Sequence, residues 1–195
     1  MTHIQGGAAE DAEAGVKRLA GELAAAWDGS DGGVSGDIAR FAEGQRLVVA
    51  VPSGTGTTAL FLARHLRHND AITVLAVPCV GPASYLRRQM QRLDHATGAV
   101  GAFPNVLEGR KPAPFGEPRA ELLKVWRQLQ EDSELYVDLL YGARTWEVLF
   151  ESWRRPDGPF AGAQVLYYHT GGLEGVSSQL NRYKHKGLVG SHQAM

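Results

Sequence analysis

The densest group of residues that could do chemistry is a run of glycines and hydroxyl side chains directly after an apolar strand pattern. Its members are Ser53, Gly54, Thr55, Gly56, Thr57 and Thr58. A strand, a glycine turn and a helix start, in this order, aim backbone N–H groups and a helix dipole at one spot, which favours a phosphate. The glycines let the backbone approach an anion closely, because no Cβ intervenes. The run predicts a phosphate-binding loop; the alternative is an ordinary strand-to-helix turn with a threonine N-cap.

The loop does not match the two common nucleotide-binding patterns. No lysine follows it, although the phosphate loop of nucleoside triphosphatases requires one. Ala59 stands where the dinucleotide pattern Gly-x-Gly-x-x-Gly has its third glycine. The sequence therefore predicts a phosphate cradle without a cation of its own, which suits a small phosphorylated cofactor.

Two further turns, over residues 140–145 and 169–172, follow apolar runs and carry polar side chains. Ligands of parallel sheets bind beyond the carboxyl ends of the strands, so these turns and the glycine loop are expected to line one pocket. Tyr141 and Thr170 are the candidate functional residues of the two turns. Tyr141 is alternatively a core aromatic and Thr170 a plain turn residue, while His169 is interpreted as a structural histidine.

Strands and helices alternate along the chain in the pattern of an α/β fold. Strands are predicted over 46–51, 72–77, 135–140 and 164–168, and helices over 8–27, 57–67, 83–93, 121–129, 143–153 and 173–182. The strand runs are apolar on both faces, which is typical of a parallel sheet with helices on both faces. Residues 98–118 are expected to form an irregular connection, and residues 187–195 a frayed tail.

Composition excludes several classes of function. The 195 residues carry 20 basic and 21 acidic side chains and no basic face with interleaved aromatics, so no nucleic-acid partner is predicted. No apolar stretch approaches the roughly 18 residues of a membrane span, and no secretory signal is visible, so a cytoplasmic or organelle-matrix location is expected. The histidines follow no metal-ligand spacing, so no metal site is expected. The single cysteine, Cys79, is expected to be a buried structural thiol rather than a reactive one.

Three segments, in this order, resemble the large domain of pyridoxal-phosphate enzymes of the tryptophan-synthase-β fold type. Within that group they resemble the 1-aminocyclopropane-1-carboxylate deaminase and D-cysteine desulfhydrase family. The segments are Ser-Gly-Thr-Gly-Thr-Thr at 53–58, Asp-Leu-Leu-Tyr at 138–141 followed by Thr-Trp-Glu at 145–147, and His-Thr-Gly-Gly at 169–172. On this resemblance residues 1–186 are interpreted as the C-terminal portion of the cofactor-binding large domain.

The resemblance implies a role for each candidate residue. Residues 53–58 would hold the phosphate of pyridoxal 5'-phosphate, mainly through backbone N–H groups, and Thr170 would stand near the pyridine nitrogen. Tyr141 would pack on the cofactor or on a small amino-acid substrate and act as an acid or base near the reacting carbon. Gly142 stands where some members carry an acidic residue for that nitrogen, which argues against a strict aminocyclopropane-carboxylate deaminase. The family also implies a homo-oligomer.

The same comparison shows that a lysine is missing. Pyridoxal enzymes hold their cofactor through a lysine Schiff base, which this family carries early in the chain in a Gly-Gly-Asn-Lys segment. None of the five lysines here lies in such a motif: Lys17, Lys111, Lys124, Lys184 and Lys186. The expected function is a pyridoxal-phosphate-dependent deaminase or lyase that needs a missing N-terminal segment or a partner chain. The alternatives are a non-catalytic phosphate- or cofactor-binding fragment and a different α/β phosphate binder such as a nucleotide-dependent transferase.

Overall fold

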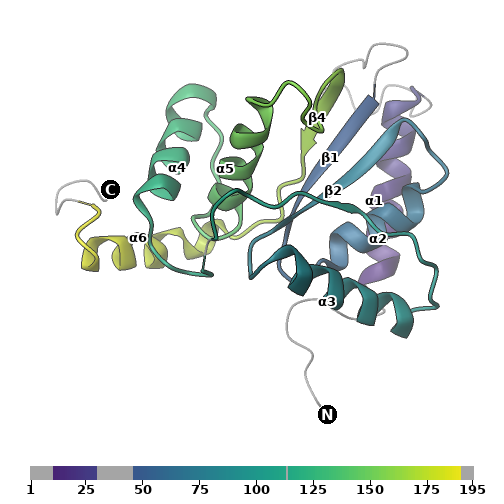
Figure 1. Ribbon diagram of the computed structural model, residues 1–195, viewed down its shortest axis with the longest axis horizontal. Helices are drawn as coiled ribbons and strands as arrows, with labels where there is room; N and C mark the ends of the chain where they lie inside the picture. Colours follow the sequence, from purple (N-terminus) through teal and green to yellow (C-terminus); the bar gives the residue numbers. More distant parts are fainter. Residues whose placement is uncertain (1–10, 30–45, 113, 190–195) are drawn as a thin grey trace.

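A four-stranded parallel sheet in the order β3-β2-β1-β4 forms the centre of the protein (Figure 1). The computed structural model describes residues 11–29, 46–112 and 114–189. The strands are β1 (Arg46–Ser53), β2 (Ile72–Pro78), β3 (Asn105–Val106) and β4 (Ala163–Tyr167). Parallel pairing runs from Leu47 opposite Ile72 to Ser53 opposite Pro78, and β4 pairs with β1 on its other side. All carboxyl ends of the strands therefore point to one edge of the sheet.

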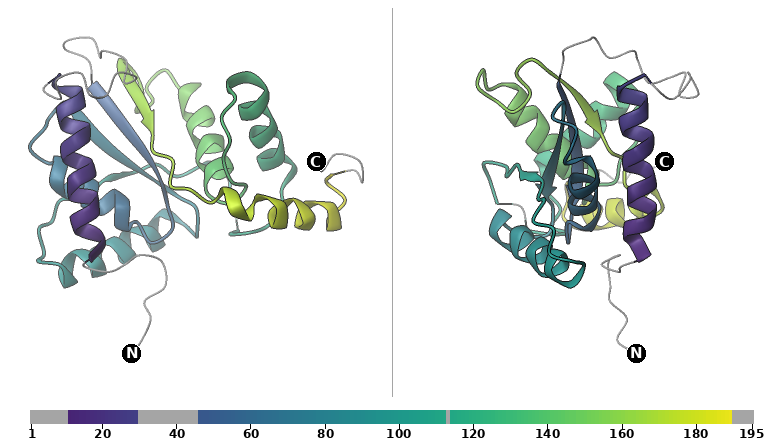
Figure 2. Two further views of the ribbon diagram at one scale, coloured as in Figure 1. Left: turned by 180° about the vertical axis from the view of Figure 1, so that it is seen from behind. Right: turned by 90° about the vertical axis from the view of Figure 1, so that its right-hand side faces the viewer.

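Helices cover both faces of this sheet, which confirms the predicted fold class (Figure 2). The helices are α1 (Asp11–Trp27), α2 (Thr57–Leu66), α3 (Ala83–Ala96), α4 (Ala120–Ser133), α5 (Gly142–Trp153) and α6 (Val176–His185). One apolar core joins α1 and α2 to the sheet, and a second joins α5 to the opposite face. A third cluster packs α4 and α6 against the start of α5.

The sequence of β1 explains why both faces are covered. Every residue from Leu47 to Val51 is almost completely buried. Successive side chains of a strand point to opposite faces, so Leu47, Val49 and Val51 join the α1–α2 core while Val48 and Ala50 join the α5 core. A strand with no polar face is stable only inside such a three-layer arrangement.

The predicted strand over residues 135–140 is wrong. This segment lies between α4 and α5 and pairs with no strand, because side chains satisfy its backbone groups instead. The Trp126 indole donates to the carbonyl of Val137 (2.8 Å), and the Gln179 amide oxygen accepts from the N–H of Leu139 (2.7 Å). The fourth strand is instead β3, two residues within the connection that the sequence indicated to be irregular.

The C-terminal region also differs in detail from expectation. The last helix begins with a 3-10 turn over Leu173–Gly175 and continues as α6 to His185. Residues 187–189, predicted to belong to a frayed tail, pack back on the fold: Leu188 donates to the Tyr183 carbonyl (3.0 Å) and Val189 is buried. Residues 8–10 of the predicted N-terminal helix and the tail beyond residue 189 lie outside the described residues. No helix among the described residues is long and apolar enough to cross a membrane.

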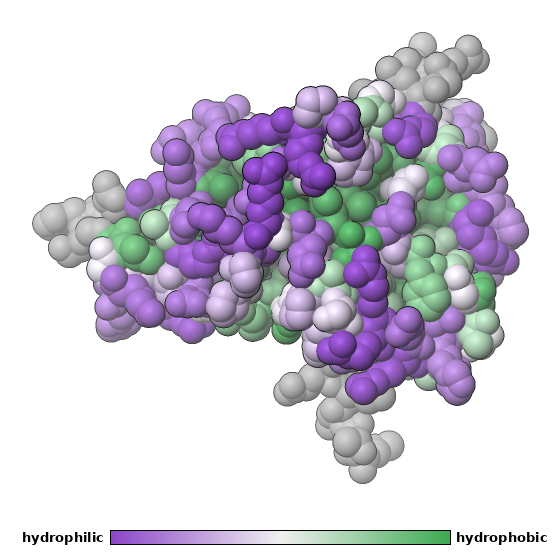
Figure 3. All heavy atoms as spheres, viewed as in Figure 1, coloured by the Kyte–Doolittle hydropathy of each residue, from purple (hydrophilic) through white to green (hydrophobic). Residues whose placement is uncertain are grey.

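An aromatic cluster fills the space between α5 and β4. Trp146 stacks on Trp153, with centroids 6.0 Å apart and planes inclined by 21°, and its ring also meets Tyr167 at 5.3 Å. Trp153 continues the cluster to Phe160 at 4.9 Å. In the space-filling view, apolar residues show between polar margins in the middle of the molecule (Figure 3). Aromatic contacts of this kind add to the stability gained by burial and fix α5 against the sheet.

A buried guanidinium joins the helices on the other face. Arg64 of α2 donates to both carboxylate oxygens of Glu13 (2.9 and 3.0 Å) on α1 and to Asp94 (2.8 Å) on α3. It also donates to the carbonyl and the hydroxyl of Thr97 (both 2.9 Å). The Arg64 and Asp94 side chains are only 4% and 8% exposed, so either charge would be costly without the other.

We predict that Arg64→Met lowers the free energy of unfolding by about 3 kcal/mol, because it leaves the Asp94 carboxylate buried without its partner. The measurement is urea unfolding followed by circular dichroism. Arg18→Met is the matched control, since Arg18 pairs with Glu22 on the surface, where the side chains are 84% and 59% exposed. That control should lose less than about 1 kcal/mol. Equal losses in the two variants would contradict the prediction.

Candidate functional site

A cavity of about 380 Å³ opens beyond the carboxyl end of β1, between the turns after β1, β2 and β4 and the segment that carries Tyr141. We call it the strand-end cavity. Its walls include every residue predicted from the sequence to bind the cofactor or to take part in catalysis: Ser53, Gly54, Thr55, Gly56, Thr57, Thr58, Tyr141 and Thr170. The strand order reverses direction at β1, which is where ligands bind in open parallel sheets. The sheet thus brings together segments that are far apart in the sequence.

The floor of the cavity is the start of α2. Its N-cap is Gly56, which has the left-handed φ of 82°, and no side-chain hydrogen bond caps the helix. The N–H groups in the first turn of a helix have no partner within it, so they are donors for a ligand. A Cβ on Gly56 would lie 2.6 Å from Cγ of Met90 and 2.8 Å from Cδ1 of Leu86. Glycine is therefore required here twice, by conformation and by the close approach of α3.

The hydroxyl groups of the loop are partly engaged within the loop itself. Ser53, which is buried, donates to the carbonyl of Val51 (3.0 Å). The hydroxyls of Thr55 and Thr57 share a hydrogen bond of 3.1 Å. These bonds hold the loop in shape, and an anion at the start of α2 would meet backbone N–H groups of the loop.

Tyr141 lies over the glycine loop. A Cβ on Gly54 would meet the Tyr141 hydroxyl at 3.3 Å, and the Tyr141 ring contacts Phe115 with centroids 5.5 Å apart. Burial, followed by the negative potentials of Cys79 and Asp138, raises the pKa of the Tyr141 phenol above its usual value. The phenol therefore stays protonated at neutral pH and can donate a hydrogen bond or a proton.

Cys79 connects the end of β1 to the segment that carries Tyr141. Its N–H donates to the Ser53 carbonyl (2.9 Å), and its thiol contacts the Tyr141 carbonyl (3.7 Å) and the Thr145 hydroxyl (3.6 Å). The thiol is buried, and burial raises its pKa to about 11. The expectation of a buried structural thiol is confirmed, because a protonated, inaccessible sulfur is a poor nucleophile.

The turn over residues 169–172 forms the exposed rim. Nδ1 of His169 accepts from the N–H of Gly171 (3.0 Å), and its Nε2 lies 3.0 Å from the Tyr136 carbonyl, where it donates. Both ring nitrogens are thus used to shape the turn, in agreement with the interpretation of a structural histidine. Thr170 is exposed and lines the cavity.

Sequence reasoning missed the turn after β2. Val80 and Tyr85, which flank Gly81 and Pro82, also line the cavity. The signal was present, because Ile72–Pro78 is a parallel strand whose end must lie beside the end of β1. Arg110 and Lys111 line a second cavity of about 530 Å³ on the other side of this turn, with Glu108 and Arg144, and do not reach the first.

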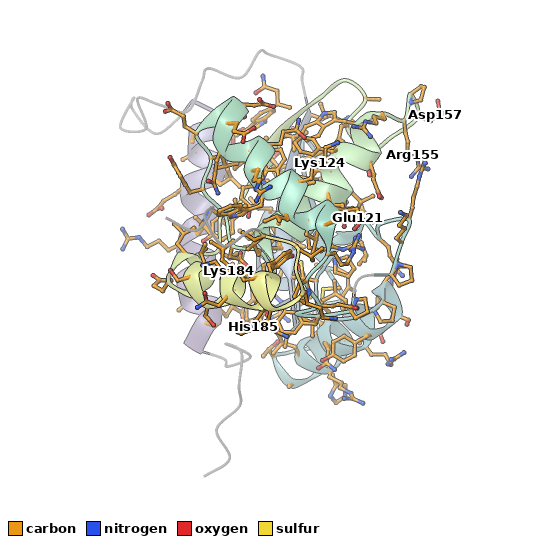
Figure 4. All side chains as sticks on the ribbon, turned by 90° about the vertical axis from the view of Figure 1, so that its left-hand side faces the viewer. Glu121, Lys124, Arg155, Asp157, Lys184 and His185 are labelled. Carbon is orange, nitrogen blue, oxygen red and sulfur yellow. The ribbon has the colours of Figure 1, made fainter. Side chains whose placement is uncertain are left out.

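None of the described residues that line the strand-end cavity carries a charge, and none of the five lysines is among them. Lys124 and Lys184 lie on α4 and α6, at the side of the molecule shown in Figure 4. The described residues also hold no group of three histidine, cysteine or acidic side chains placed to bind a metal ion. The arrangement can bind an anion through neutral donors.

The fold has a relative of known structure. No protein-family model and no curated protein matches the chain. A crystal structure of an ACC deaminase homologue superposes with a TM-score of 0.63 and 18% sequence identity, covering 91% of this chain and 52% of that chain. The chain therefore spans about half the length of that protein, and the likeness shows the fold.

We predict that Gly56→Ala destabilises the fold more than Gly162→Ala. Both glycines have positive φ, but a Cβ at Gly162 meets nothing within 4 Å. The difference in unfolding free energy should be about 1–3 kcal/mol, the usual cost of overpacking. Urea unfolding of the two variants measures it, and equal stabilities would show that α3 does not press on the loop.

We also predict that a thiol reagent such as Ellman's reagent does not modify Cys79 in the folded chain at neutral pH. The reagent needs a thiolate, and the raised pKa together with burial leaves almost none accessible. Urea should restore full reaction, and because the chain has one cysteine, the absorbance signal has a single source. Rapid modification without urea would contradict the burial of this thiol.

Proposed function

We propose that the strand-end cavity binds the phosphate of pyridoxal 5'-phosphate, and that the chain supplies this site to a deaminase or lyase acting on a small amino acid. The observation that carries the proposal is the uncapped start of α2, with Gly56 at its N-cap, at the floor of a cavity without charged walls. A helix N-terminus of this kind is built for a phosphate. The loop sequence and the order of the three turns resemble the pyridoxal enzymes described above.

The residues present fit the cofactor. About 380 Å³ lies within the roughly 300–1,000 Å³ of small-molecule sites. Residues 53–58 would hold the phosphate, and the Thr170 hydroxyl and the Tyr141 phenol lie on the same cavity for the ring and the substrate. The cofactor, when bound, supplies the electron sink of the reaction; the protein supplies orientation and proton transfer. The protonated Tyr141 phenol is suited to hold or deliver that proton.

Catalysis needs a lysine that this cavity does not contain. All five lysines lie in described parts of the chain and outside the cavity lining. Covalent attachment of the cofactor would then depend on a lysine from another polypeptide segment, consistent with the half-length match to the ACC deaminase homologue. A D-cysteine or aminocyclopropane-carboxylate type of substrate follows from the resemblance. The second candidate, a binding module without catalysis, is favoured by the same absence of lysine.

We predict that pyridoxal 5'-phosphate binds the purified chain at least about tenfold more tightly than pyridoxal, which lacks the phosphate, because charge-assisted hydrogen bonds to the loop are lost without it. Thr57→Val should weaken only the phosphorylated ligand, since the hydroxyl that shapes the loop is gone. Isothermal titration calorimetry measures both effects. Thr73→Val on β2 is the matched control, because Thr73 lines a different cavity.

These titrations, together with a borohydride reduction, distinguish the alternative functions. Equal affinity for the two pyridoxal compounds, or tighter binding of a nucleotide, would contradict a pyridoxal-phosphate site. Borohydride treatment of the loaded chain should give no adduct at a defined lysine if the attaching lysine comes from elsewhere. A single stable adduct would show that this chain provides the lysine itself.

A further inference from the structure

Asp138 is a buried carboxylate that no part of the proposed cofactor site uses directly. Its side chain is in the segment between α4 and α5, and the residue is 3% exposed. Oδ1 accepts from the N–H groups of Leu140 and Tyr141 (both 2.7 Å), and Oδ2 accepts from the N–H of Gly142 (2.9 Å). One side chain thus fixes three consecutive peptide groups, and the middle one carries the phenol of the cavity.

The same carboxylate contacts the turn over residues 169–172, which forms the rim of the cavity. Gly172 has a φ of 96°, and a Cβ added there would lie 3.3 Å from Cγ and 3.4 Å from Oδ2 of Asp138. The turn that carries Thr170 therefore packs directly on the group that holds Tyr141. Tyr141 and Gly172 are 31 residues apart in the sequence, and this contact brings their turns together.

The charge of Asp138 is balanced by backbone dipoles. Among the described residues no lysine, arginine or histidine forms an ion pair with it, while three N–H groups and the start of α5 surround it. A carboxylate before a helix N-terminus is stabilised by the helix dipole. Its negative potential contributes to the raised pKa of Cys79, Tyr141 and Tyr167, in each case after burial.

We propose that Asp138 is a positioning residue of the strand-end cavity: its carboxylate sets the Tyr141 phenol over Gly54 and seats the turn that presents Thr170. This role rests on the proposed function for the identity of the ligand. The contacts between the two turns do not depend on that ligand. A neutral or shorter side chain would release both walls together.

The test compares Asp138→Asn with Asp94→Asn. Asp94 is buried, as Asp138 is, but it pairs with Arg64 and lies away from the cavity. This variant therefore loses a buried carboxylate without changing a contact of either turn. The first readout is the ionisation of Tyr141, obtained as the difference in tyrosinate absorbance between each protein and its Tyr141→Phe version. In Asp138→Asn the phenol should titrate at lower pH than in the parent, and in Asp94→Asn at the parent's pH.

The second readout is the affinity for pyridoxal 5'-phosphate by calorimetry. It should fall about tenfold in Asp138→Asn, the effect of one lost charge-assisted hydrogen bond, and stay unchanged in Asp94→Asn. An unchanged Tyr141 titration in folded Asp138→Asn overturns the proposal. If the parent itself binds no pyridoxal 5'-phosphate, the proposed function fails, and the Tyr141 titration alone decides the positioning role.

A pair of glycine variants keeps the test decisive if Asp138→Asn does not fold. Gly171 and Gly172 both have positive φ, but only a Cβ at Gly172 meets the Asp138 carboxylate. Gly172→Ala should shift the Tyr141 titration and Gly171→Ala should leave it in place. Identical Tyr141 titrations in these two variants would overturn the contact between the turns.

Discussion

The parallel pairing of β1 with β2 and β4 is the constraint on which the rest of the structure depends. Because every strand runs the same way, the segments after them arrive at one edge, whatever their separation in the sequence. A one-residue slip of β1 would exchange the side chains that pack in its two different cores, so the packing on both faces favours one register. The direction of the strands therefore determines where the cavity lies, and the residues of the turns determine its chemistry.

Three small contacts convert this edge into a defined site. Gly56 lets α3 press against the start of α2, Cys79 ties the end of β1 to the start of α5, and Asp138 joins the Tyr141 turn to the rim. All three use neutral or backbone-satisfied groups, so the cavity carries no charged wall. An anion bound there would interact with dipoles in a partly buried setting, where such interactions are stronger than in water.

How far the sequence predicts the structure depends on where each segment finds its hydrogen bonds. β1 and α2 were predicted to within two residues, because a continuous apolar run and a glycine loop are local signals. The segment at 135–140 has the same apolar pattern, yet its backbone partners include Trp126 and Gln179, side chains whose positions depend on tertiary packing. Strand order places residues 53–58 and Thr170 at one edge of the sheet, whereas Tyr141 reaches the cavity from a segment that pairs with no strand. The bracing role of Asp138 depends on Gly172, 34 residues later, and no local pattern connects the two.

The aromatic cluster between α5 and β4 also has a spectroscopic consequence. Aromatic rings held at fixed mutual inclinations give a circular dichroism signal in the near ultraviolet. Such rings here are Trp146, Trp153 and Tyr167. Such a signal vanishes when tertiary packing loosens even while helices persist. Tyr167 lies in edge contact with His169, next to Thr170, so this optical signature reports on the same strand that delivers the rim of the cavity. Near-ultraviolet circular dichroism therefore measures the order of the side of the protein that carries the cavity.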